Sequence, residues 1–177
     1  YGDSQSDILF GGDGDDTLIG GEGNDKLDAG YDDDFLFGDI GNDFLNGDRG
    51  SDTYFFSLGD GYDYIKDKSK RNSSDVDTIV FDETVSKDDV VFSIRNGDLF
   101  LQYSDNDTIR IKDQEHSMYG IERIELADGN YLTNDDIDLV IQQINSFGKE
   151  NGMCRIENND IRKSNELMQI VSSSWHA

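Results

Sequence analysis

The sequence predicts an all-β protein in which a parallel β-roll is followed by a small capping β segment and a C-terminal helix. The main observation is a nine-residue repeat without insertions, with copies that start at Gly2, Gly11, Gly20, Ala29, Gly38 and Gly47. A seventh copy starts at Leu58, after the two extra residues Phe56 and Ser57. The other two observations are β-type alternation after the repeats and a helical apolar pattern beyond it. We therefore divide the chain into residues 1–66, 67–132 and 133–177.

Each copy of the repeat carries the same residue types at three kinds of position. The sixth position is always an aspartate: Asp7, Asp16, Asp25, Asp34, Asp43, Asp52 and Asp63. The eighth is always large and apolar: Leu9, Leu18, Leu27, Leu36, Leu45, Tyr54 and Ile65. Glycine dominates the first, second and fourth positions, where it permits the positive φ of a tight turn. Asp32, Asp39 and Asp48 replace glycine at some of these positions, and short polar residues tolerate positive φ better than other side chains.

This period predicts a coil built from short strands and turns. The last three residues of a copy can form only a very short strand, which is unstable alone, so the copies must stack. Two turns and two strands make one coil, and the eighth-position side chains fill its narrow interior. An acidic, glycine-rich linker is the alternative, but a linker needs no fixed register.

Stacking of this kind brings aspartates of turns two copies apart to about 4.8 Å, the spacing of paired strands. Like charges at that range repel, and a cation between them reverses the interaction. Calcium accepts six to eight oxygen ligands in flexible geometry, whereas magnesium requires a tighter octahedron. The repeats contain no cysteine or histidine, which argues against zinc or copper.

The copies resemble the nonapeptide GGxGxDxUx of the RTX (repeats-in-toxin) family. The resemblance implies a right-handed parallel β-helix, the β-roll, with calcium between each turn and the turn two copies later. It also implies that one turn supplies its aspartate and the carbonyls of its second and fourth residues. The later turn would supply its aspartate and the carbonyls of its first and third residues. Two sites follow from this scheme: Gly12, Gly14 and Asp16 with Ala29, Tyr31 and Asp34, and Gly21, Gly23 and Asp25 with Gly38, Ile40 and Asp43.

The same scheme implies further calcium ligands: Asp7, Gly20, Glu22, Gly30, Asp32, Gly41, Gly47, Arg49, Asp52 and Asp63. Asp32 and Asp39 depart from glycine, but they remove no carbonyl group. The first copy, with Gln5 and Ser6, and the shifted seventh copy fit the pattern less closely. We therefore expect about four or five calcium ions, of which about four occupy well-formed sites.

The charge of the chain points to cations as partners. The 177 residues include 39 acids and 15 bases, a net charge of −24. Residues 1–66 hold 17 acids and 3 bases, so 17 − 3 gives −14 in the repeats alone. This charge excludes nucleic acid and anionic membranes as electrostatic partners of the module. Without cations, self-repulsion should keep the repeats expanded.

Neither a transmembrane run nor an N-terminal signal peptide is recognisable in the sequence. Because position 1 falls inside a repeat, we expect a fragment of a longer protein, in which any membrane contact belongs to upstream regions. No host-cell target is indicated.

Residues 67–132 carry a series of strand patterns that we interpret as antiparallel. The expected strands are Val76–Phe81, Val90–Arg95, Asp98–Tyr103, Thr108–Lys112, Ile121–Leu126 and Tyr131–Leu132. Asn96–Gly97 indicates a type I′ hairpin turn. We expect this segment to extend the sheets of the roll, after closing rungs at Thr53–Phe56 and Tyr64–Ile65. The pattern resembles the haemolysin-type calcium-binding related domain that follows RTX repeats.

The C-terminal segment begins with a helix signal. Residues Thr133–Asp136 offer an N-cap and first-turn acids. Ile137, Val140, Ile141 and Ile144 follow at helical spacing, and Gly148 is expected just past the helix end. Residues 149–177 are polar, with an apolar cluster at Leu167, Met168, Ile170 and Val171. This tail looks like the uncleaved C-terminal signal of RTX proteins that leave through type I exporters; a frayed terminus is the alternative.

Three functions were compared. The first is a calcium-dependent folding and secretion module of an RTX protein, toxin-like and extracellular, either released or attached to the cell surface. The second, an enzyme, is not expected: His116, His176 and Cys154 are isolated, and no GxSxG, HExxH or phosphate-binding motif occurs. The third is a calcium-stiffened adhesin or ligand-binding terminus. It would use Tyr54, Phe55, Phe56 and Tyr64 as a surface patch, against the simpler interpretation that these rings pack inside.

Overall fold

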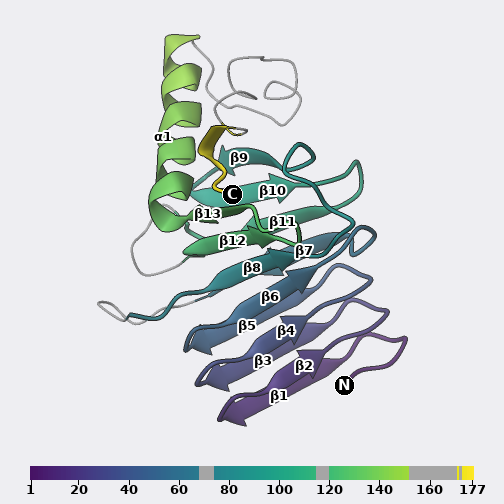
Figure 1. The fold of residues 1–177 in the computed structure, drawn as a ribbon. Coiled ribbons are helices and arrows are strands. Elements are labelled where there is room, and N and C mark those ends of the chain that lie inside the picture. The colour runs from purple at the N-terminus through teal and green to yellow at the C-terminus, as the bar shows by residue number, and fades with distance from the viewer. Residues whose placement is uncertain (68–73, 115–119, 152–170, 172) are drawn as a thin grey trace.

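Two β-sheets face each other along the molecule and enclose one continuous apolar core (Figure 1). The computed structural model describes residues 1–67, 74–114, 120–151, 171 and 173–177. Within these residues, one sheet has the order β1 (Ile8–Asp13), β3 (Lys26–Tyr31), β5 (Phe44–Arg49), β7 (Tyr62–Ile65), β11 (Thr108–Ile111), β10 (Asp98–Gln102) and β9 (Val91–Arg95). The other has the order β13 (Tyr131–Thr133), β12 (Arg123–Leu126), β8 (Thr78–Phe81), β6 (Thr53–Phe56), β4 (Phe35–Phe37) and β2 (Thr17–Ile19).

The repeats form a parallel β-roll with one coil per eighteen residues. In one sheet Ile8 pairs with Lys26, which pairs with Phe44, each step being 18 residues. Thr17, Phe35 and Thr53 show the same step in the other sheet. The predicted fold class and coil length are therefore confirmed.

The seventh copy stays in register despite its two extra residues. Phe44 pairs with Tyr64, and Leu45 with Ile65, at a step of 20 residues. Phe56 extends β6 by one residue and Ser57 lies in the turn that follows, so the insertion is absorbed at the edge of the roll.

The eighth-position side chains form the interior of the roll, as predicted. Leu27, Leu36, Leu45, Tyr54 and Ile65 are all 0% exposed. Full burial of each side chain of this size contributes about 1.5–3 kcal/mol. These side chains form two facing rows, one on each sheet, that fill the interior of the roll.

The aspartates that replace glycine adopt the predicted backbone conformation. The φ angles of Asp32, Asp39 and Asp48 are 76°, 61° and 75°. Asn96 and Gly97 have φ angles of 56° and 86°, which confirms the type I′ turn between β9 and β10.

The strands after the repeats continue both sheets of the roll, but their pairing corrects our antiparallel interpretation. β8 pairs with β6, β12 with β8, and β11 with β7, all in parallel. Among the described strands, antiparallel pairs join β9, β10 and β11, and β12 to β13. The chain crosses from one sheet to the other between β6, β7 and β8, as within the repeats, so β8 arrives in the same direction as β6.

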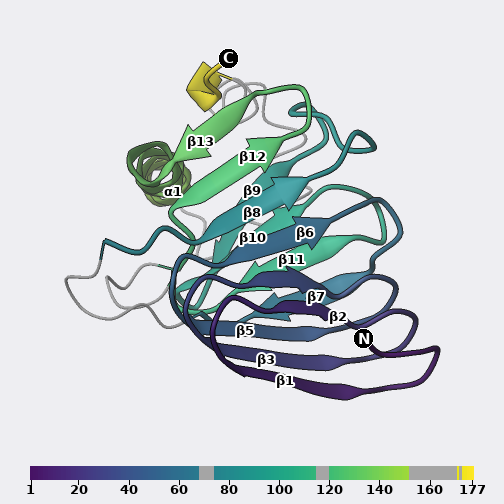
Figure 2. The same cartoon turned by 60° about the horizontal axis from the view of Figure 1, so that its bottom comes forward.

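Helix α1 (Asn134–Glu150) packs against β9 and β13 at the capped end (Figure 2). Thr133 is the N-cap, and its backbone N–H donates to Asp136 Oδ2 at 2.9 Å. The predicted apolar stripe is buried. We had predicted that Gly148 lies just past the helix end. It instead lies within the helix and is buried, and Asn151 is the C-cap. Gly148 lies on the buried face of α1 together with Ile137, Val140, Ile141 and Ile144.

The last residues of the chain join the cap. Tyr131 and His176 exchange two backbone hydrogen bonds of 3.0 and 2.9 Å, and Trp175 is only 9% exposed. His176 Nε2 lies 2.9 Å from Asp136 Oδ2. The predicted apolar cluster lies outside the described residues except for Val171, which is buried. His116 and Cys154 also lie outside them.

Candidate metal centre

The sixth-position aspartates form a ladder along one edge of the roll. The backbone N–H of Asp7 donates to Asp25 Oδ1 at 2.8 Å, and that of Asp25 donates to Asp43 Oδ1 at 2.7 Å. Asp43 N–H donates to Asp63 Oδ1 at 3.0 Å. Each carboxylate therefore lies between its own turn and the turn before it.

A second ladder runs along the opposite edge and extends beyond the repeats. Asp16, Asp34 and Asp52 are linked in the same way, at 2.7 and 2.9 Å. Asp52 N–H then donates to Asp77 Oδ1 at 3.0 Å, and Asp77 N–H donates to Glu122 Oε2 at 2.9 Å.

Our sequence reasoning missed Asp77 and Glu122. A signal for Asp77 was present, because residues 77–81 (DTIVF) repeat the pattern of residues 52–56 (DTYFF). Both segments place an aspartate directly before a strand of the same sheet.

The second oxygen of each inner carboxylate is buried without a hydrogen-bond partner. These oxygens are Oδ2 of Asp25, Asp34, Asp43, Asp52 and Asp63. The five residues are at most 3% exposed. A buried charged oxygen that accepts no hydrogen bond costs several kcal/mol. Five such oxygens at equivalent positions fit a ligand role rather than a packing accident.

Backbone carbonyl oxygens also point into the intervals between stacked turns. A Cβ atom on Gly30 would lie 2.3 Å from the Gly12 carbonyl oxygen, and one on Gly11 would lie 2.5 Å from the Ala29 carbonyl oxygen. The Gly12 and Ala29 oxygens therefore both point into the interval between these two stacked turns. Hard oxygen donors of two kinds, carboxylate and carbonyl, thus converge there, and this donor set suits calcium.

The next predicted site has the same arrangement. A Cβ atom on Gly41 would lie 1.5 Å from the Gly23 carbonyl oxygen, and one on Gly20 would lie 2.7 Å from that of Gly38. The Ile40 carbonyl accepts the N–H of Gly23 at 2.8 Å, so it also points back into this interval.

The comparisons with known proteins agree with this geometry. Residues 1–30, 19–54 and 28–65 match the model of the RTX calcium-binding nonapeptide repeat (4 copies). Residues 89–136 match the haemolysin-type calcium binding protein related domain. Residues 1–65 are therefore RTX calcium-binding repeats, and a haemolysin-type calcium-binding related domain follows them. A search of the curated proteins found no match.

The RTX repeats of this chain are calcium-binding structural elements, and repeats of this kind are typical of secreted proteins. Over the part of the chain that the structure describes, no helix has the length and apolar character needed to cross a membrane.

Burial raises the pKa of the inner carboxyl groups of this RTX roll. The pKa of Asp34 rises to about 6, those of Asp43 and Asp52 to about 7, and that of Asp63 to about 8. Desolvation is the main cause, neighbouring carboxylates add to it, and the amide hydrogen bonds oppose it. Without a positive charge in the intervals, the folded roll therefore disfavours its own ionised ladder at neutral pH.

The remaining predicted ligands lie in the stacked turns. The side chains of Glu22, Tyr31, Ile40 and Arg49 are exposed, which is compatible with the carbonyl role that the scheme gives these residues. Asp32 Oδ2 accepts the N–H of Gly14 at 3.1 Å, so this side chain supports the preceding turn. Gly20, Gly21, Gly30, Gly41 and Gly47 occupy the first, second and fourth positions, and their calcium-ligand roles stay predictions.

Asp7 differs from the inner carboxylates. It is half-buried at the N-terminal end of its ladder, and its Oδ2 accepts the N–H of Asp3 at 2.8 Å. The interval next to Asp7 therefore offers a less enclosed site than the others.

Proposed function

We propose that this RTX chain is a calcium-dependent folding module of a secreted protein. It would stay unfolded at the low calcium concentration of the cytosol and fold outside the cell after type I export. The observation that carries the proposal is the series of buried carboxylate oxygens without hydrogen-bond partners in the two ladders.

Among the described residues, the five inner carboxylates, Asp25, Asp34, Asp43, Asp52 and Asp63, take part in none of the ion pairs found. The ion pairs found there involve other acids, such as Asp28 with Lys26 and Asp98 with Arg110. Bound calcium would supply positive charge to the intervals between the turns. Because unfolded turns do not hold these oxygens together, the binding free energy becomes folding free energy.

The intervals within the ladders lead us to expect a certain number of ions in the repeats. One edge has three intervals, between Asp7, Asp25, Asp43 and Asp63. The other edge has two within the repeats, between Asp16, Asp34 and Asp52. The total of 3 + 2 gives five intervals, at the upper end of the four or five ions predicted from the sequence.

The net charge of −14 in residues 1–66 favours an expanded chain before export. The C-terminal tail, residues 149–177, is proposed to carry the export signal. Its last residues pair with β13 in the folded chain, so an exporter would have to recognise the tail before the cap forms. Extracellular calcium is in the range that weak extracellular modules bind, about 0.1–1 mM.

Circular dichroism with stepwise addition of calcium tests this function. In chelator the 177-residue chain should give a disordered far-UV spectrum, and millimolar calcium should convert it to a β-rich one. Magnesium at the same concentration should not convert the spectrum, because magnesium requires a tighter ligand geometry than calcium. Asp43→Asn should raise the calcium midpoint, whereas the same change at exposed Asp105 should leave it unchanged. Equal β content in chelator and in calcium would contradict the proposal.

The adhesin alternative gains no support from the aromatic residues that suggested it. Tyr54 and Phe56 are buried in the core. Phe55 stacks on Phe37 with ring centroids 4.3 Å apart, and Tyr64 packs against Phe44 at 5.5 Å. These four rings therefore contribute to the core or to packing between neighbouring coils of the roll.

A further inference from the structure

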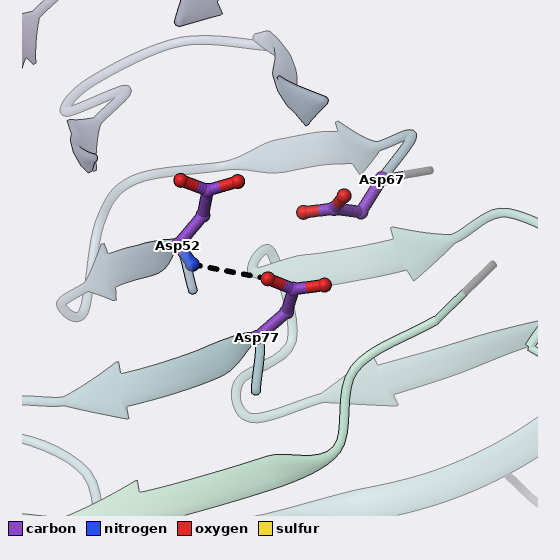
Figure 3. A group of neighbouring side chains, drawn as sticks. All are labelled: Asp52, Asp67 and Asp77. Atoms are coloured by element: carbon purple, nitrogen blue, oxygen red, sulfur yellow. Dashed lines mark hydrogen bonds between the residues drawn. The ribbon is translucent and has the colours of Figure 1, made fainter. Parts of the chain in front are cut away.

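Three buried carboxylates meet where the repeats join the cap. We call Asp52, Asp67 and Asp77 the junction cluster. They come from three segments: Asp52 lies directly before β6, Asp67 two residues after β7, and Asp77 directly before β8 (Figure 3). Their exposures are 0%, 1% and 0%, and one carboxylate oxygen of each lies within 4.8 Å of the other two. Two of the three residues lie outside the seven repeat copies.

The separations suit a single ion of calcium size. Calcium–oxygen bonds measure about 2.3–2.6 Å, so two ligands on opposite sides of one ion lie up to about 5 Å apart. Asp52 Oδ2 is buried and accepts no hydrogen bond, while Oδ1 of the same residue accepts the N–H of Asp34. In Figure 3 the carboxylate of Asp67 points toward Asp52, and the carboxylate of Asp77 lies beside the backbone nitrogen of Asp52. The buried Asp52 Oδ2 is the independent sign that the cluster holds a ligand.

Tyr54 fixes the orientation of Asp67. The Tyr54 hydroxyl accepts the N–H of Gly47 at 2.8 Å and donates its own proton to Asp67 Oδ2. A buried hydroxyl that receives one hydrogen bond and passes another to a carboxylate holds that carboxylate in one position. Such outer contacts are typical of metal ligands, whose geometry they set.

The junction cluster differs from the intervals within the repeats in its charge. Ile65 pairs with Leu45, so Asp67 stacks on Gly47, the first residue of its turn. At this position the first six copies have glycine or alanine and the seventh has Leu58, so none of the seven has an acid. The junction interval therefore holds three carboxylates, whereas an interval within the repeats has two. Affinity for calcium rises with the number of charged ligands.

We propose that Asp52, Asp67 and Asp77 bind one further calcium ion, which joins β8, and with it the cap, to the roll. The inference rests on the proposed function, because it requires that the chain folds with calcium. It goes beyond that function in adding a site whose ligands Asp67 and Asp77 are not part of a repeat copy. The total expected for the folded chain is then six ions, from 5 + 1 intervals.

Counting bound calcium in the full 177-residue chain tests the site. Equilibrium dialysis with radioactive calcium should give one ion fewer per chain for Asp67→Asn than for the unchanged chain. Asparagine keeps an oxygen that can accept the Tyr54 hydroxyl proton, so the variant removes charge and little else. Asp105→Asn, an exposed position in the loop between β10 and β11, is the matched control and should bind as many ions as the unchanged chain.

The outcomes separate this inference from the proposed function. If the unchanged chain binds no calcium and does not fold, the function and the inference both fail. If it binds and folds, and Asp67→Asn binds the same number of ions equally tightly, the inference alone is overturned. Should Asp67→Asn fail to fold, a crystal of the unchanged chain grown in calcium decides. An ion within bonding distance of all three carboxylates supports the site, and a water molecule or a basic side chain in that place overturns it.

Discussion

Acidification in the absence of calcium is predicted to favour folding of the β-roll, because protonation removes the buried negative charge of the ladders. The perturbation is a change from about pH 8 to about pH 5 in chelator, which takes the ladder carboxyl groups through their folded-state pKa values. Those values are about 6 for Asp34, about 7 for Asp43 and Asp52, and about 8 for Asp63, against 3.8 for an ordinary aspartate. Protons would then take the place of calcium in offsetting the buried charges.

The direction follows from the sign of these shifts. A group whose pKa is higher in the folded chain binds protons more tightly there, so its contribution to stability is complete below about pH 4. The contribution is lost as the pH rises to about 8, where Asp63 ionises. Each proton taken up on folding changes the stability by about 1.4 kcal/mol per pH unit. If only two of the four groups take up a proton, the change is about 3 kcal/mol per pH unit, which is large beside the 5–15 kcal/mol of a typical domain.

Far-UV circular dichroism against pH, with chelator present throughout, measures this effect. Asp43→Asn removes one titrating group, so its transition should depend less steeply on pH than that of the unchanged chain. Asp105→Asn removes one exposed charge and should keep the full slope. If both variants have the slope of the unchanged chain, general neutralisation of the acidic surface explains the effect and the reasoning about the ladders is refuted. Absence of any β signal at about pH 5 would refute it as well.

Two further predictions concern the turns and the core. Gly41→Ala should abolish calcium-induced β structure by circular dichroism, because its Cβ would lie 1.5 Å from the Gly23 carbonyl oxygen. Gly59→Ala meets no atom within 4 Å and should cost only the strain of its positive φ, about 1–2 kcal/mol. Equal losses of β structure in Gly41→Ala and Gly59→Ala would contradict the close approach of the stacked turns at Gly41. Leu36→Ala should lower the free energy of unfolding in calcium, measured with urea, by about 3 kcal/mol. Leu139→Ala, on the exposed face of α1, should change it by less than about 1 kcal/mol, and equal effects would argue against the predicted core.

The roll could be predicted from the sequence because its determinants are local and periodic. Each turn needs residues that accept positive φ, and Asp32, Asp39 and Asp48 show that the requirement concerns the backbone rather than glycine itself. Each strand needs one apolar residue that points inward. Since the period is constant, the position of one copy fixes the position of the next.

The cap could be predicted only in part, because its pairing is not local. The turn at Asn96–Gly97 joins two neighbouring strands, and it was found from two residues. The partner of β8, in contrast, lies 25 residues earlier in the chain, and that of β12 lies 45 residues earlier. Hairpin signals around these strands suggested antiparallel neighbours. The strands pair in parallel instead, because the chain alternates between the two sheets.

The candidate site shows the same division. The ladder aspartates of the repeats were found from their spacing, and the structure places them in two continuous series. Asp67 was not among the predicted ligands, because its proposed role depends on which turn it stacks on, and the long connection between β7 and β8 hides that relation in the sequence. The helix end was misplaced as well, because α1 continues past Gly148 to Glu150 and Asn151 is the C-cap.

If calcium occupies the intervals of the ladders, we expect neighbouring sites to be coupled. Asp43 accepts the amide of Asp25 through one oxygen and donates its own amide to Asp63, so its turn belongs to two intervals at once. Ordering one interval therefore fixes half of the donors of the next, which lowers the entropy cost of forming it. Ordering one edge should also favour order at the opposite edge, because the strands that leave the turns of both edges pack in the same apolar core. At the junction, where the repeats end, Asp67 and Asp77 supply carboxylates from residues outside the repeats, and the same coupling can then pass from the roll into β8 and the cap.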